Sequence, residues 1–116
     1  MKITLIGSTQ YGKLFNEHCE HLLKEGHTVK IPALDDNQKL DEFGVCMYNK
    51  DAILWADEIH LIWDRRSVGT IFDFGMVFMA QKPFKIIYLE PKTFEGVMRK
   101  YEDFTSFPKE NEGDTR

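Results

Sequence analysis

The sequence predicts an α/β fold in which a parallel sheet of four or five strands lies between layers of helices. Short apolar runs alternate with amphipathic stretches along the 116 residues, and the connections are long enough for right-handed helical crossovers. This pattern favours a flavodoxin-like strand order, 2-1-3-4, with a short fifth strand as an option. We therefore expect one three-layer, Rossmann-like domain over residues 1–106 and a polar, flexible tail over residues 107–116.

The first half of the chain begins with a strand, a loop and a helix. An apolar run over residues 2–6 stops at Gly7-Ser8, and apolar side chains then recur at helical spacing over residues 11–22. A β-branched run over residues 27–32 predicts the second strand. The polar residues 33–41 show no periodicity, which predicts a mobile loop long enough to act as a lid.

A second helix is expected over residues 42–55, with Phe43, Met47, Ile53 and Leu54 facing inward. The third strand, over residues 58–63, is almost continuously apolar. Such a run is typical of a parallel strand that is covered on both faces.

The last predicted elements are a helix, a strand and a short helix. Residues 69–81 are apolar and helical in pattern, and residues 84–89 form the fourth strand before Pro91 interrupts it. The final helix is expected over residues 93–101, with Thr93 as its N-cap.

Composition excludes several classes of function. A net charge of -4, from 15 basic and 19 acidic side chains, gives no positive surface for a nucleic acid polymer or an anionic membrane. No window approaches the roughly 18 apolar residues of a membrane span. Cys19 and Cys46 belong to no CxxC pair, and the N-terminus lacks a signal-peptide core. We therefore expect a cytoplasmic protein with reduced thiols.

Neither a cofactor nor a metal is expected. The dinucleotide fingerprint GxGxxG is absent after the first strand, where GSTQYG stands instead. His18 and His21 have helical spacing but would need a third converging ligand to hold a metal ion. His60, inside an apolar strand, is interpreted as a hydrogen-bonded core histidine.

The most informative segment is residues 63–83, which sets Asp73 where a strand passes into a helix. Ser67 and the turn Gly69-Thr70 precede this carboxylate. In the 2-1-3 strand order, the Gly7-Ser8 loop and the loop over residues 64–70 should open into one crevice. There the helix N-terminus offers N–H groups and a positive dipole to an anion.

The second half of the chain carries a series of short motifs. In order, they are Ala56-Asp57, an apolar strand, Ser67-x-Gly69-Thr70, Asp73-x-Gly75 and Lys82-Pro83. This series resembles the nucleoside 2-deoxyribosyltransferase superfamily. The spacing from Ser67 to Asp73 is most similar to the branch of 2-deoxynucleoside 5-monophosphate N-glycosidases, and the resemblance extends over residues 1–100.

The resemblance implies cleavage of an N-glycosidic bond, or deoxyribosyl transfer, on a nucleoside or nucleoside 5-monophosphate. Asp73 falls at the position of the family's catalytic glutamate and would act as nucleophile or electrostatic stabiliser. The same resemblance implies a homodimer or higher assembly. It also implies a sugar-phosphate site at Gly7, Ser8, Ser67, Gly69 and Thr70.

Base-side roles are assigned from position in the chain. Asp64, at the end of the third strand, is the best local candidate for the general acid. Tyr11 and Trp63 are candidates to cover the base, although both also suit core packing.

The sequence departs from the family at three positions: Asp73 replaces the glutamate, Asn49 stands where an aspartate is usual, and Gly96 stands where the glycosidases have a serine. These departures keep a second hypothesis open, a non-catalytic protein that binds a nucleotide-derived ligand as a sensor or sequestering protein. A structural domain with no ligand is a third. Asp73 could then serve only the helix dipole, and Ser67 only the helix cap.

Overall fold

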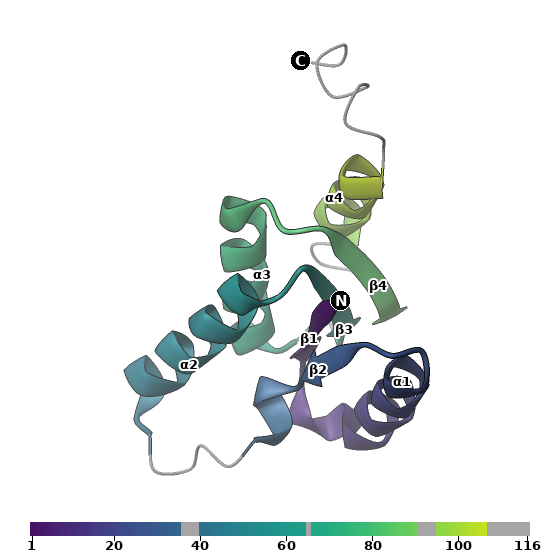
Figure 1. The fold of residues 1–116 in the computed structure, drawn as a ribbon. Coiled ribbons are helices and arrows are strands. Elements are labelled where there is room, and N and C mark those ends of the chain that lie inside the picture. Colours follow the sequence, from purple (N-terminus) through teal and green to yellow (C-terminus); the bar gives the residue numbers. More distant parts are fainter. Residues whose placement is uncertain (36–39, 65, 91–94, 107–116) are drawn as a thin grey trace.

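A parallel sheet forms the centre of the molecule (Figure 1). The computed structural model describes residues 1–35, 40–64, 66–90 and 95–106. Within them the sheet has the order β2-β1-β3-β4, which confirms the predicted 2-1-3-4 order. Its strands are β1 (Lys2–Gly7), β2 (Thr28–Lys30), β3 (Glu58–Trp63) and β4 (Phe84–Leu89). No fifth strand occurs in the described part of the chain.

Helices cover both faces of the sheet. Helix α1 (Gly12–Lys24) packs on one face, where Phe15 and Leu22 meet the β1 side chains Ile3 and Leu5. The other face carries α2 (Glu42–Trp55), α3 (Val68–Ala80) and α4 (Glu95–Ser106). Short 3-10 turns, η1 (Thr9–Tyr11) and η2 (Pro32–Leu34), follow β1 and β2. The three layers are those that the sequence predicts.

Side-chain caps fix where the two central helices begin. The Asp41 carboxylate accepts a hydrogen bond from the Gly44 N–H at 2.7 Å, and the Ser67 hydroxyl oxygen accepts one from the Thr70 N–H at 3.2 Å. Each cap satisfies an N–H group that lacks a partner in the first helical turn. Helix α3 ends where Gln81 adopts a left-handed conformation, with φ of 55°.

The predicted inward face of α2 is wrong at three of its four positions. Ile53 is buried, but Phe43, Met47 and Leu54 are exposed. Apolar side chains occur almost all round this helix, so periodicity could not tell the buried face from the outer one. The face that packs inward carries Ala52 and Ile53.

Three boundaries differ from the predictions. Strand β2 is only three residues long and pairs with β1 alone, at the edge of the sheet; η2 begins at Pro32, two residues after it ends. Part of the predicted polar loop is ordered instead as η2. Helix α4 runs to Ser106, five residues beyond its predicted end. The proposed N-cap Thr93, the loop residues 36–39 and the tail 107–116 lie outside the described residues.

Two further findings concern membrane-spanning helices and the state of the cysteines. No helix among the described residues is both long and apolar enough to cross a membrane. Cys19 and Cys46 are free cysteines, and each is partly buried.

Candidate functional site

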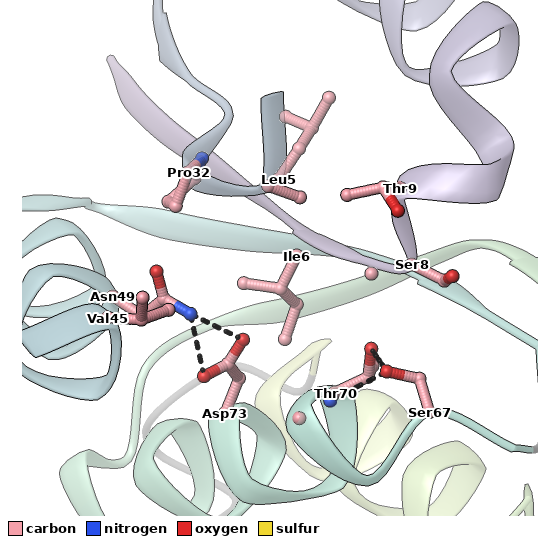
Figure 2. A pocket seen from close by; sticks show the side chains of 13 residues that line it. Leu5, Ile6, Ser8, Thr9, Pro32, Val45, Asn49, Ser67, Thr70 and Asp73 are labelled. Atoms are coloured by element: carbon pink, nitrogen blue, oxygen red, sulfur yellow. Dashed lines mark hydrogen bonds between the residues drawn. The ribbon is translucent and has the colours of Figure 1, made fainter. Parts of the chain in front are cut away.

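A cavity of about 270 Å³ lies at the carboxyl end of β1, between this strand, η2 and the helices α2 and α3 (Figure 2). Open parallel sheets bind ligands at the carboxyl ends of their strands. The volume is just below the roughly 300 Å³ of a small drug site and suits a sugar-sized group. The cavity is lined by Leu5, Ile6, Gly7, Ser8, Thr9, Pro32, Ala33, Val45, Asn49, Ser67, Gly69, Thr70 and Asp73. The lining therefore combines apolar side chains with hydroxyl groups, an amide and a carboxylate.

Asp73 provides the carboxylate of this cavity. It lies on the second turn of α3, only 7% exposed, and faces Asn49 of α2 (Figure 2). The Asn49 Nδ2 group donates to both carboxylate oxygens, at 3.3 and 3.2 Å. Burial raises the pKa of Asp73 to about 6, although the hydrogen bond from Asn49 opposes this effect. The group is therefore mostly ionised at neutral pH and still able to take up a proton.

Asn49 is a site residue that the sequence identified only as a departure from the family pattern. Its amide nitrogen holds Asp73, whereas its buried Oδ1 has no hydrogen-bond partner among the described residues. In Figure 2 this oxygen points away from Asp73. A buried acceptor without a partner is rare, and a ligand O–H or N–H group would satisfy it.

Ser67 and Thr70, at the N-terminus of α3, supply two of the hydroxyl groups of the lining. The Thr70 hydroxyl donates to Ser67 Oγ at 2.9 Å, and the Thr70 N–H donates to the same oxygen. Ser67 Oγ therefore accepts two hydrogen bonds and keeps its own O–H to donate. Ser8, beyond the end of β1, lines the cavity with them. The structure thus brings together the predicted residues Gly7, Ser8, Ser67, Gly69, Thr70 and Asp73.

Asp64 is placed differently from the predicted general acid. It does not line the cavity, and its Oδ1 accepts from the N–H groups of Arg66 at 3.0 Å and Ser67 at 2.8 Å. Its other oxygen accepts from the Gln10 side chain at 3.0 Å. Burial favours the protonated form, but the backbone hydrogen bonds outweigh it and hold the pKa below its usual value. Asp64 is built to stay ionised and to tie the β3–α3 loop to η1.

Replacement of Asp64 by alanine should destabilise the fold by about 3 kcal/mol, because two backbone N–H groups and an amide lose a charged acceptor. Urea denaturation would measure the change. Asp51→Ala is a matched control, since that exposed carboxylate only approaches Lys50, at 3.9 Å, and should shift stability by less than about 0.5 kcal/mol. Equal midpoints for the two variants would contradict this role of Asp64.

The two candidates for covering a base do not line the cavity. Trp63 is 1% exposed and belongs to the core beneath α3 and α4. The Tyr11 hydroxyl donates to Glu90 at 2.8 Å. Burial and this carboxylate raise the pKa of Tyr11 to about 12. The core-packing interpretation holds for Trp63, and Tyr11 connects η1 to the end of β4.

His18, His60 and Glu58 are joined by hydrogen bonds on the α1 face of the sheet, apart from the cavity. His60 is buried, and its two ring nitrogens contact His18 at 2.8 Å and Glu58 at 2.6 Å. Burial and the neighbouring His60 lower the pKa of His18 to about 4. No group of three or more potential metal ligands gathers within the described ranges. His60 is thus the hydrogen-bonded core residue that the sequence indicates.

Fold and cavity together define a three-layer α/β protein with a buried carboxylate, Asp73, in a cavity at the carboxyl end of β1. No family model, curated protein or solved structure matches this chain. The likeness to the nucleoside 2-deoxyribosyltransferase superfamily therefore remains a resemblance of short motifs. Function has to be argued from the geometry of the site.

Proposed function

We propose that this protein cleaves the N-glycosidic bond of a nucleoside or nucleoside 5-monophosphate, by hydrolysis or by transfer of the sugar. The observation that carries the proposal is Asp73, a buried carboxylate on the wall of a sugar-sized cavity with a pKa of about 6. Such a carboxylate can trap an oxocarbenium-like C1 atom as an ester or stabilise its charge. The resemblance at residues 67–73 supports the same chemistry.

The neighbours of Asp73 have roles in this reaction. Asn49 holds the carboxylate through both oxygens, which limits its rotation and favours the ionised form. Ser8, Ser67 and Gly69 would hold the sugar, or its phosphate, through hydroxyl and backbone donors. Pro32 and Val45, two apolar residues of the lining, would exclude water from the developing cation.

A panel of nucleosides, 2-deoxynucleosides and their 5-monophosphates tests the proposal. Each compound is incubated with the protein, and release of the free base is followed by chromatography, with and without an acceptor base. We expect release from at least one class of compound. Release only when an acceptor is present would identify a transferase, and release in water alone would identify a hydrolase.

A binding function is the second candidate, and Asn49 is the observation that favours it. An amide at this position cannot donate a proton to a leaving base as a carboxylic acid would. A sensor or sequestering protein would need only the cavity and its donors. Saturable binding of a nucleoside or nucleotide, measured by calorimetry, with no base release from any compound of the panel, would assign the protein to this class.

The partner in solution is proposed to be a second copy of the chain, as the resemblance implies. The helices α2 and α3 lie side by side (Figure 1), and both carry exposed apolar side chains. These side chains are Phe43, Met47, Leu54, Val68, Phe72 and Met79. An exposed apolar surface on two adjacent helices is typical of a homodimer interface.

The free thiols fit the reducing environment of the cytoplasm, where we propose that the protein is located.

Met79→Glu should separate this dimer, because it puts a charge into the apolar contact. Met79 is 85% exposed in the single chain, so the variant should fold normally. Sedimentation analysis should give a dimer for the wild type and a monomer for the variant. Leu23→Glu, on the exposed side of α1, is the control and should stay dimeric. A monomeric wild type at micromolar concentration would refute the interface.

A further inference from the structure

The leaving group decides what an N-glycosidase needs besides a carboxylate at C1. A neutral base departs as an anion unless an acid protonates it while the bond breaks, and such an acid contributes roughly 10²–10⁴-fold to the rate. A base that already carries a positive charge departs as a neutral molecule. It needs no acid.

The described part of the cavity wall holds no such acid. Asp73 is the only lining residue there with an acidic or basic side chain. Asn49, beside it, carries an amide that cannot release a proton at physiological pH. The Asp64 carboxyl, just beyond the end of β3, lies outside the lining and is held ionised by backbone N–H groups.

The charge of the cavity favours the same kind of ligand. The described lining includes a buried carboxylate and no lysine, arginine or histidine. Asn49 is the only hydrogen-bond donor that the structure gives to the Asp73 carboxylate within the described residues. A cationic ligand bound beside Asp73 would gain Coulombic attraction in a partly desolvated site, and it would lower the cost of keeping this carboxylate ionised.

We propose that the substrates of this site are cationic N-glycosides, such as a pyridinium riboside or a nucleoside of a 7-methylated purine. The inference rests on the proposed function and specifies its substrate class. The C1–N bond breaks, and its electron pair neutralises the charged ring nitrogen. The Asp73 carboxylate bonds to C1 or stabilises its positive charge. Water then adds at C1 and releases one proton to solvent, and the products are the free sugar and the neutral base.

Guanosine and 7-methylguanosine form the matched pair for the first experiment, since they differ by one methyl group and one charge. Base release is measured below neutral pH, where the methylated base is cationic, and each rate is divided by the rate without protein. We expect the acceleration to be at least about 100-fold larger for 7-methylguanosine, the size of a missing general acid. Nicotinamide riboside should also release its base.

Two outcomes separate this inference from the function on which it rests. Equal acceleration of guanosine would mean that an acid outside the described lining protonates the base. The inference would then be wrong, and the N-glycosidase function would stand. Absence of base release from guanosine, 7-methylguanosine and nicotinamide riboside would overturn both.

Asn49→Asp provides a second test, because it places a protonatable carboxyl beside Asp73. Two neighbouring carboxyl groups share a proton, so one of them can act as an acid. We expect guanosine cleavage to rise at least tenfold and to fall again at alkaline pH, with no rise for 7-methylguanosine. Asn49→Leu, which has similar volume and no acid, should show no gain on guanosine. An equal gain in both variants would show that proton donation is not what the site lacks.

Discussion

Asp73→Asn is expected to abolish base release while making the folded chain more stable at neutral pH. The amide keeps the size of the side chain but can neither bond to C1 nor balance a positive charge there. We expect the rate on the best substrate to fall by about 10³-fold or more. Chromatographic assay of wild type and variant at pH 7 measures this directly. Base release that persists in the variant would remove Asp73 from the mechanism.

The gain in stability follows from the raised pKa of Asp73. The pKa is about 6 in the folded chain, whereas an unperturbed aspartate has a pKa of 3.8. Ionisation is thus harder in the folded state, and the buried charge costs the wild type about 3 kcal/mol above pH 6. This cost shrinks as the pH falls from 6 towards 4, because the folded carboxyl becomes protonated, and it disappears below pH 3.8, where the carboxyl is protonated in the unfolded state as well. The variant never has it.

Urea denaturation at several pH values separates this effect from a general change in packing. The variant should exceed the wild type by up to about 3 kcal/mol at pH 8, and the difference should shrink towards pH 4. Asp103→Asn, at an exposed position of α4, should change neither stability nor activity. A stability difference that is independent of pH would show that Asp73 is not desolvated as the structure indicates. Because the variant is expected to be the more stable protein, lost activity could not be attributed to unfolding.

The strand order was predictable because each buried strand leaves a local signal. Residues 58–63 are almost continuously apolar in sequence, and every side chain of β3 from Ile59 to Trp63 is buried. Crossover helices of ordinary length then left few possible topologies. Helix α2 carries no comparable signal, because its apolar residues Phe43 and Leu54 face outward while Ile53 faces inward.

The candidate site was predictable only in part. Ser67, Gly69 and Asp73 are close in sequence. The strand order places the loop after β1 beside the loop after β3, at the carboxyl ends of both strands, so the approach of these residues to Ser8 could be inferred. The contact between Asn49 and Asp73 depends on how α2 packs against α3, and no periodicity encodes it. That Asp64 lies outside the lining could not be predicted for a related reason: at the end of a strand, a carboxylate that caps a loop looks the same in sequence as one that faces a ligand.

The second large effect is expected at Gly7, the last residue of β1. Its φ of 154° is rarely adopted by residues with a side chain. A Cβ atom there would lie 2.4 Å from the backbone oxygen of Ile62 and 2.9 Å from the Phe15 ring. The oxygen belongs to the neighbouring strand β3 and cannot move without breaking the sheet register. Gly7→Ala should therefore cost about 3 kcal/mol or more in unfolding free energy.

Thermal and urea denaturation of Gly7→Ala would measure this cost. Gly75→Ala is the matched control, because a Cβ atom at that position of α3 meets nothing within 4 Å and should stabilise the helix by up to about 1 kcal/mol. Similar midpoints for the two variants would mean that β1 and β3 can separate at Gly7. Gly7 also lines the cavity that contains Asp73, so the shift needed to accommodate a Cβ atom there would disturb the lining. A Gly7→Ala chain that still folds should therefore bind its ligand more weakly.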